Sequence, residues 1–196
     1  MKMIGLTGGF GTGKTFVASI FKSLGAKVLD ADKEAHDVIK KGRPAYKRII
    51  GAFGSGVLNK NGNIDRRRLA DMVFAIKGKL ARLNKIVHPE VIEAIKRGIT
   101  NAAEDIIIID APLLIEANLM KMVDYLMVVK ASRKNQIKRC MKKFHITRHD
   151  VIKRSRHQIP VGRKIKMADF VIDNDGAMSD TRKQVKKIWR EIYGNS

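Results

Sequence analysis

A glycine-rich octet near the N-terminus has the most definite chemistry in this sequence. Residues 8–15 read GGFGTGKT and fit the phosphate-binding pattern G-x-x-x-x-G-K-[ST]. The glycines let successive backbone N–H groups point at one anion, and a helix that starts directly after them adds further free N–H groups. Lys14 can reach the β- and γ-phosphates of a nucleoside triphosphate, and the Thr15 hydroxyl can hold Mg²⁺. Residues 8–15 are called the phosphate loop below.

Acidic side chains follow two other apolar runs. Asp30 and Asp32 come after residues 27–29, and Asp110 follows four isoleucines. Carboxylates at the carboxyl ends of parallel strands face the ligand crevice of an α/β sheet. Asp110 is similar to the acid of a Walker B strand, which reaches Mg²⁺ directly or through water.

The pair Asp30 and Asp32 allows two interpretations. If the strand continued through Asp32, both side chains would lie on one side of the sheet, whereas a turn would separate them. One of them could accept a proton from a hydroxyl group or hold a magnesium-bound water. Alternatively, either acid could cap the helix that follows.

The elements that must position these residues alternate along the chain. Apolar runs predict buried strands at 3–6, 27–29, 106–109, 125–129 and 170–172. Helical patterns lie at 14–24, 33–40, 44–53, 66–73, 77–98, 134–143, 148–157 and 179–193, and residues 51–62 are typical of a loop. This alternation predicts an α/β fold with a five-stranded parallel sheet and right-handed crossovers.

Composition and length are those of one globular domain. The chain has 196 residues, of which 44% are hydrophobic, and no apolar run approaches a membrane span. The first residues run directly into a predicted strand, so we expect no signal peptide. The single cysteine excludes an internal disulfide and is typical of a reducing compartment. We therefore expect a cytoplasmic protein without a membrane partner.

The net charge of +21 is concentrated in one segment. Residues 130–166 contain 14 basic residues and only one acid, Asp150. This basic segment has three interpretations: a mobile element that binds phosphates, a nucleic-acid interface, or a solvated helix face. Aromatic residues make up 6% of the chain and are not interleaved with the basic ones as base-stacking platforms would be. We therefore expect no nucleic-acid partner.

Two weaker patterns do not define a site. Asn84-Lys85 begins the guanine-specific pattern N-K-x-D, but the aspartate is absent, so a GTPase is not indicated. Cys140, His145 and His149 lack a fourth ligand and the usual zinc spacing. A half-buried cysteine and two solvated histidines are the simpler interpretation.

Several further segments, in this order along the chain, resemble the dephospho-coenzyme A kinase family. They are residues 5–9 with the phosphate loop, 30–32 (DAD), 62–69, 88–89 (HP), 110–116 (DAPLLIE), 136–139, 158–160 and 168–176 (ADFVIDNDG). Many nucleotide-binding proteins share the phosphate loop, but the combination of the other segments is far more specific. The resemblance covers nearly the whole chain.

The resemblance implies transfer of the γ-phosphoryl group of ATP to the ribose 3′-hydroxyl of dephospho-coenzyme A, with Mg²⁺ as cofactor. It implies a three-layer P-loop core (1–32, 104–130 and 168–196), a helical acceptor-binding insertion (about 33–103) and a basic helical lid over ATP (about 131–167). Expected catalytic residues are Asp32, Lys14 and Arg139. Expected ATP contacts are Gly8, Gly9, Gly11, Thr12, Gly13, Lys14, Thr15, Phe16, Arg139, Arg154, Asn174 and Gly176. Expected acceptor contacts are Asp32, His88, Asp110, Pro112, Leu113, Leu114 and Glu116.

Some of these roles have simpler alternatives, and the chain departs from the family in places. His88 could be a packed turn residue, Leu113 and Leu114 ordinary core, and 174–176 a plain turn. Magnesium is assigned to Thr15, with Asp32 or Asp110 acting through water. Phe10, Thr12 and Phe16 replace the commoner Ile, Ser and Thr, and Lys143 stands where a second lid arginine is usual. The alternative functions are a kinase for another small nucleotide or nucleoside and a nucleic-acid-binding ATPase.

Overall fold

The computed structural model describes residues 1–117, 119–156 and 158–194. The chain divides into two compact units. The first unit comprises Met1–Asp30 and Ala102–Ser196, and the second comprises Ala31–Asn101. The second unit is therefore an insertion between two strands of the first.

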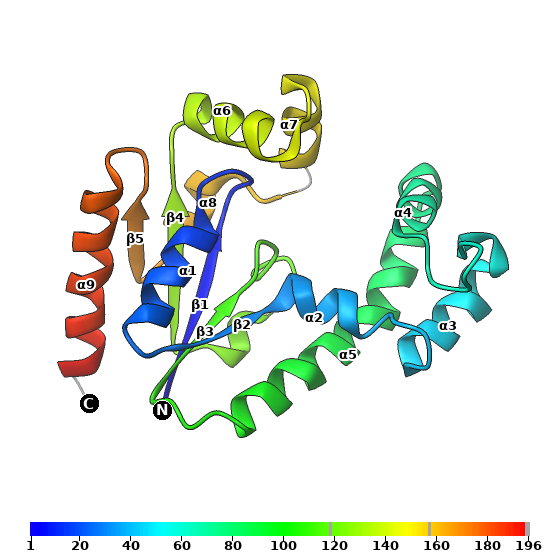
Figure 1. Ribbon diagram of the computed structural model, residues 1–196, viewed down its shortest axis with the longest axis horizontal. Helices are drawn as coiled ribbons and strands as arrows, with labels where there is room; N and C mark the ends of the chain where they lie inside the picture. Colours follow the sequence, from blue (N-terminus) through cyan, green and yellow to red (C-terminus); the bar gives the residue numbers. More distant parts are fainter. Residues whose placement is uncertain (118, 157, 195–196) are drawn as a thin grey trace. The chain divides into compact units, whose positions relative to one another are not determined.

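A five-stranded parallel sheet forms the centre of the first unit (Figure 1). Its strands are β1 (Lys2–Gly8), β2 (Lys27–Asp30), β3 (Ile106–Asp110), β4 (Tyr125–Lys130) and β5 (Phe170–Asp173), in the order β2-β3-β1-β4-β5. All five predicted strands and their parallel arrangement are confirmed. In the register of β1 and β3, Leu6 pairs with Asp110, so the acid lies beside the start of the phosphate loop.

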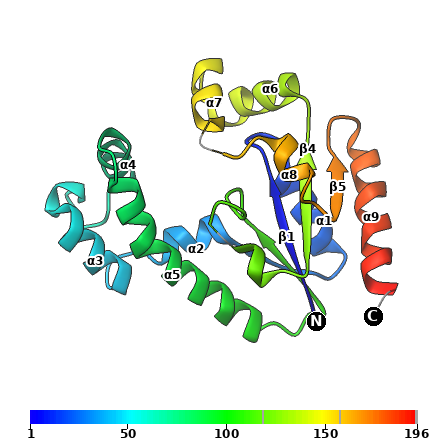
Figure 2. The ribbon, with the colours of Figure 1, turned by 180° about the vertical axis from the view of Figure 1, so that it is seen from behind.

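Helices and turns cover the two faces of this sheet, which gives three layers. On one face, α1 (Lys14–Ser23) and α9 (Met178–Gly194) bury Phe21 and Val185 against Ile4 and Ile108. On the other face lie the turn after β3, the 3-10 helix η2 (Leu119–Met122) and α8 (Val161–Ile165). Figure 2 shows α8 on the side of the sheet opposite α1. Burial of one large apolar side chain such as Phe21 contributes about 1.5–3 kcal/mol.

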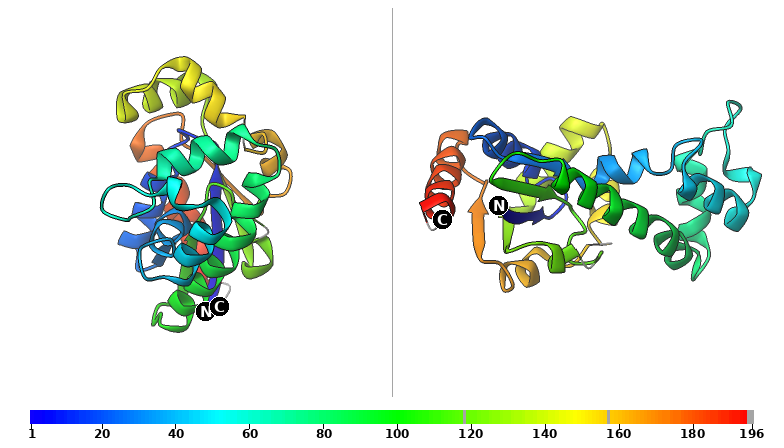
Figure 3. Two further views of the ribbon diagram at one scale, coloured as in Figure 1. Left: turned by 90° about the vertical axis from the view of Figure 1, so that its right-hand side faces the viewer. Right: turned by 90° about the horizontal axis from the view of Figure 1, so that it is seen from below.

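The ends of the described chain lie side by side in the first unit (Figure 3). The Lys2 ammonium donates to the Ile192 carbonyl over 2.8 Å, which joins β1 to the last turns of α9. Within the described residues, no helix is both long enough and apolar enough to cross a membrane.

The basic segment between β4 and β5 folds into α6 (Arg133–Phe144), α7 (Arg148–Ser155) and α8. The Ser132 hydroxyl caps α6, and Thr147 and Asp150 form a capping box at α7. His145 ends α6 in the left-handed region at φ 52°. The short helix α8 was not predicted. The helix predicted at 148–157 corresponds to α7, and its predicted last residue, 157, lies outside the described residues.

The second unit is helical. It contains α2 (Ala31–Asp37), α3 (Pro44–Phe53), the 3-10 helix η1 (Ser55–Val57), α4 (Arg66–Ala75) and α5 (Lys79–Thr100). One cluster of buried residues in this unit consists of Ile49, Val57, Leu69 and Val73, with half-buried apolar side chains packed against it. The predicted loop at 51–62 is wrong in part, because α3 continues to Phe53 and η1 follows it.

Candidate active site

The phosphate loop is held from within by a buried threonine. Thr12 is fully buried, and both its backbone N–H and its hydroxyl donate to the Gly9 carbonyl, over 3.2 and 2.9 Å. Gly13 has a φ of 86° and immediately precedes α1. The first N–H groups of α1 are therefore at the end of the loop, where a helix attracts anions.

Asn174, at the end of β5, holds the loop from the side. Its Nδ2 donates to the Thr12 carbonyl over 2.7 Å, and its Oδ1 accepts from the Thr181 hydroxyl over 2.8 Å. A side chain at Gly13 would collide with this amide, so the position requires glycine on steric grounds as well as for its φ. The amide of Asn174, an expected ATP contact, is thus engaged with the loop.

Arg139 reaches the same place from α6. Its guanidinium donates to the Thr12 carbonyl over 3.4 Å and to the Asn174 carbonyl over 2.8 Å. The arginine is half-buried, and two of its donors lie at the loop. It is therefore adjacent to the predicted phosphate site.

Lys14 forms an ion pair with Asp110. Their side chains are 14% and 8% exposed, so the pair is shielded from most of the solvent. The structure thus brings together the two charged groups that the sequence placed on the phosphate loop and on the Walker B-type strand. Thr15 is exposed at the start of α1, next in the chain to Lys14.

Phe16, which departs from the family pattern, is half-buried and packs against the hydrophobic core of the first unit. The Arg182 guanidinium lies over its ring, 5.4 Å from the centroid. The aromatic side chain therefore lies against the core, and the Phe16 backbone N–H donates to the Gly13 carbonyl of the phosphate loop over 2.9 Å.

The turn after β3, residues 112–117, is called the acceptor-side turn below. Leu113 is 44% exposed, whereas Leu114 is fully buried and packs against Gly5. This difference favours a core role for Leu114. The Pro112 carbonyl accepts from the Thr7 hydroxyl, which links the turn to β1.

Glu116 of this turn is engaged inside the protein. Its carboxylate accepts from the Ile159 N–H over 2.8 Å and forms an ion pair of 3.0 Å with Lys164. Lys164 is 0% exposed. Sequence reasoning did not single out Lys164, because a lysine among thirteen other basic residues gives no signal of burial.

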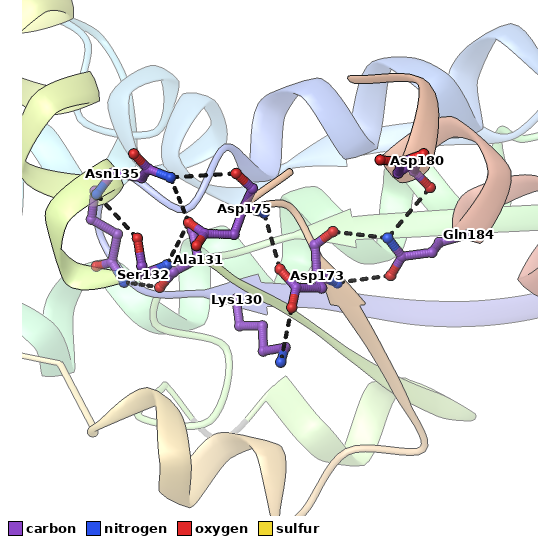
Figure 4. Close-up of polar contacts among 9 residues, drawn as sticks. Lys130, Ala131, Ser132, Asn135, Asp173, Asp175, Asp180 and Gln184 are labelled. Carbon is purple, nitrogen blue, oxygen red and sulfur yellow. Dashed lines mark hydrogen bonds and ion pairs between the residues drawn. The ribbon is translucent and has the colours of Figure 1, made fainter. Parts of the chain in front are cut away.

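The backbone that leads from β5 to α9 is fixed by a separate polar cluster (Figure 4). Asp173 accepts from the Lys130 ammonium over 3.0 Å, and Gln184 bonds to both backbone groups of Asp173. Asp175 accepts from the Ser132 N–H and the Asn135 side chain, both over 2.8 Å.

The hydrogen bonds to Asp175 shift the pKa of its carboxyl, and the next residue, Gly176, takes no part in them. The Ser132 N–H, followed by the Asn135 amide, lowers the pKa of the Asp175 carboxyl below its usual range. Gly176 follows in an exposed position. Asp175, which lies between the predicted contacts Asn174 and Gly176, therefore fixes the start of α6.

Aromatic contacts join α6 and α7 to the phosphate loop. The rings of Phe10 and Phe144 stack at 5.4 Å, and the Arg154 guanidinium lies 5.8 Å from the Phe10 centroid. The Gln158 side chain also accepts from the Phe10 N–H over 2.9 Å. Arg154, a predicted phosphate ligand, is exposed and lies on the loop's aromatic ring.

The metal interpretation of Cys140 receives no support. No group of three or more His, Cys, Asp or Glu residues that could hold a metal occurs in the described parts of the chain. Cys140 is 1% exposed, so the expectation of a half-buried thiol is wrong, and burial raises its pKa. Its sulfur packs on Gly11, where an added Cβ would be only 2.6 Å away. His145 and His149 are exposed as expected.

In the second unit, Asp32 lies in the first turn of α2, which begins directly after β2. The strand ends at Asp30, so the interpretation in which both acids share one side of a strand is wrong.

His88 is half-buried within α5, not in a turn, and burial lowers its pKa. Val87, the residue before His88, helps to line an apolar cavity of about 280 Å³. The other lining residues include Ile39, Leu69, Val73 and Leu83.

The chain is similar to known proteins in both sequence and structure. The sequence model of the family described as dephospho-CoA kinase matches residues 2–180. A dephospho-CoA kinase of Aquifex aeolicus is 43% identical over 98% of both chains. Another, of Carboxydothermus hydrogenoformans, is 41% identical over 96% of this chain and 93% of its own.

Two solved structures are similar over almost their whole length. TT1252 from Thermus thermophilus superposes with a TM-score of 0.85 at 30% identity and covers 97% of each chain. The dephospho-CoA kinase from Campylobacter jejuni gives a TM-score of 0.71 at 27% identity, covering 99% of this chain and 98% of its own. This chain therefore belongs to the dephospho-CoA kinase family.

Proposed function

We propose that this protein phosphorylates the ribose 3′-hydroxyl of dephospho-coenzyme A with ATP, which yields coenzyme A and ADP. The family match over residues 2–180 supports the activity. The single observation that carries the proposal is the buried pair of Lys14 and Asp110 at the end of the phosphate loop. This pair is where a P-loop kinase needs a cation for the phosphates and an acid for the metal.

The nucleotide site consists mainly of backbone N–H groups. In our proposal, residues 8–16 surround the phosphates, and Lys14 exchanges Asp110 for the β- and γ-phosphates when ATP binds. Arg139 and Arg154 add positive charge from α6 and α7, and Gly176 borders the adenine. Asn174 acts through the loop, because its amide already bonds to the Thr12 carbonyl.

The oxygen donors near the loop suit Mg²⁺. Magnesium keeps several waters and binds proteins through one or two oxygen ligands together with substrate phosphates, so a cluster of acids is not required. The Thr15 hydroxyl and the carboxylates of Asp110 or Asp32 would hold it, directly or through water. When bound, the ion neutralises charge on the phosphate oxygens.

Asp32 is our proposed acceptor-orienting acid. It accepts the proton of the 3′-hydroxyl as the oxygen forms a bond to the γ-phosphorus and the bond from that phosphorus to the β-phosphate oxygen breaks. His88, Pro112 and Leu113 are proposed to contact the rest of the acceptor. Positioning and charge neutralisation then supply most of the rate enhancement.

Mass spectrometry of a reaction with ATP, Mg²⁺ and dephospho-coenzyme A tests the proposal. We expect coenzyme A and ADP in equal amounts, with nucleosides and other nucleotides as poor acceptors in parallel reactions. A better nucleoside acceptor would favour the alternative kinase. ATP hydrolysis stimulated by DNA, without any phosphorylated acceptor, would favour the nucleic-acid-binding alternative that residues 130–166 suggest. We place the reaction in the cytoplasm, since a lone thiol suits a reducing compartment.

A further inference from the structure

A fully buried lysine has no part in the reaction described above. Lys164 belongs to α8, at the end of the basic segment, and its side chain is 0% exposed. Lysine is almost never fully buried unless it is paired, because an ammonium loses its hydration when it leaves water. The groups that compensate its charge therefore define its role.

Its partners come from two other segments of the first unit. The ammonium donates to the Pro112 carbonyl over 2.8 Å and to the Thr7 hydroxyl over 3.4 Å, and it pairs with the Glu116 carboxylate at 3.0 and 3.2 Å. Three donors thus meet three acceptor groups, which accounts for the full hydrogen-bonding capacity of a lysine. Thr7 precedes the phosphate loop, and Pro112 and Glu116 belong to the acceptor-side turn.

The two partner segments, β1 and the acceptor-side turn, differ in what else holds them. Thr7 lies in β1, between β3 and β4, so the strand ladders fix it without Lys164. Among the described residues, the backbone bonds of the acceptor-side turn, such as Ala117 N–H to the Leu113 carbonyl over 2.7 Å, are local. Its other contacts are those with Thr7, Ile159 and Lys164 and the packing of the buried Leu114 side chain against Gly5. Loss of the ammonium should therefore loosen the turn far more than β1.

We propose that Lys164 is a positioning residue that fixes the acceptor-side turn against the end of the basic segment. The Glu116 carboxylate holds both Lys164 and the Ile159 N–H, so one carboxylate joins the turn to the segment that leads into α8. The turn carries Pro112 and Leu113, so their geometry toward the acceptor depends on this buried ion pair. The statement about the acceptor rests on the proposed function.

Lys164→Met tests the proposal, because it keeps the length of the side chain and removes the charge. We expect the KM for dephospho-coenzyme A to rise at least tenfold, while the KM for ATP changes less than threefold. Lys27→Met is the matched control, since Lys27 pairs with Glu104 at the exposed start of β2 and should leave both constants unchanged. Equal increases in both KM values, or a loss of activity that only follows the folded fraction, would refute the positioning role.

Glu116→Gln adds a test that survives poor folding of the first variant. This variant leaves a buried ammonium without its counter-charge. It should therefore raise the KM for dephospho-coenzyme A more than the double variant that also carries Lys164→Met. If the double variant is as impaired as the two single variants combined, the pair is not coupled and the proposal fails.

A readout without substrate separates this proposal from the proposed function. In Lys164→Met, hydrogen exchange should accelerate in peptides that cover 112–117 and 158–160 and stay unchanged in β1. This result would support the role of Lys164 even if wild-type protein did not phosphorylate dephospho-coenzyme A. Unchanged exchange in both peptides would refute it, whatever the acceptor.

Discussion

The two units of the chain differ in how they hold their functional residues. In the first unit, the phosphate loop is fixed by hydrogen bonds from three elements: its own Thr12, Arg139 of α6 and Asn174 after β5. In the second unit, Asp32 is an exposed residue of α2 and His88 a half-buried residue of α5. We therefore propose that nucleotide chemistry is built on a rigid base and acceptor chemistry on the helical insertion.

The largest loss of turnover should come from a change in the phosphate loop of the first unit. Lys14→Ala removes the cation that the buried Asp110 holds at the loop, and we expect turnover to fall about 10³-fold. Steady-state kinetics with saturating substrates measures it. Lys22→Ala, on the exposed last turn of the same helix, should be within twofold of wild type. A similar loss in both variants would show that the charge of α1, not the position of Lys14, matters.

Asp32→Asn tests the acceptor side. Loss of a group that takes the hydroxyl proton should lower turnover about 10²-fold, with ATP affinity within threefold of wild type. Asp37→Asn is the control on the same helix, because Asp37 pairs with Lys40 in an exposed position. Collapse of ATP affinity in Asp32→Asn would instead make this residue a metal ligand or a structural group, and the contrast between the two units would fail.

Asn174→Ala sharpens the account of the rigid base. It removes the bonds to the Thr12 carbonyl and the Thr181 hydroxyl, each worth about 1 kcal/mol, so the Kd for ATP should rise roughly tenfold. Isothermal titration measures it. Thr181→Val should show a smaller rise, since it affects the loop only through Asn174. Gln184→Ala, which loses bonds to Asp173 and none to the loop, should bind ATP normally.

The smallest effect concerns the pH dependence of the helical unit. Burial lowers the pKa of His88, so the folded protein binds a proton there less readily than the unfolded chain. The stability that neutral His88 provides is present above its ordinary pKa of about 6.5 and is lost as pH falls through the lowered value. His88→Gln should therefore reduce the acid-induced drop in Tm between pH 7 and pH 5 by roughly 1–2 °C.

A matched control exists for this pH experiment. His36 is exposed on α2 of the same unit, so His36→Gln should leave the pH dependence of Tm unchanged. If His36→Gln flattens the profile as much as His88→Gln, burial of His88 is not the cause.

Local patterns were enough to predict the sheet. The isoleucine run of β3 and the apolar runs of the other strands each match one strand of the structure within about two residues. The phosphate loop was predictable for the same reason, because its pattern is contiguous. The register of β1 and β3 places Asp110 beside Leu6, two residues before the phosphate loop, and Lys14 of the loop pairs with it.

Features that depend on distant contacts were not predictable. The helix α8 has five residues and is anchored by Lys164, whose partners lie more than 45 positions away in sequence. The sequence left open whether Asp32 continues a strand or caps a helix, and the structure places it in the first turn of α2, which starts at Ala31. The burial of Cys140 depends on its contact with Gly11, which no local pattern indicates.

The central claim is that a phosphoryl group passes directly from ATP on the phosphate loop to a hydroxyl of the acceptor. A reaction with ATP labelled with ¹⁸O in its γ-phosphate, followed by ³¹P nuclear magnetic resonance of the products, tests it most directly. The account predicts that the labelled phosphorus appears as the 3′-phosphate of coenzyme A, in an amount equal to the ADP formed. Label found in inorganic phosphate, or at any other position of the acceptor, would contradict it.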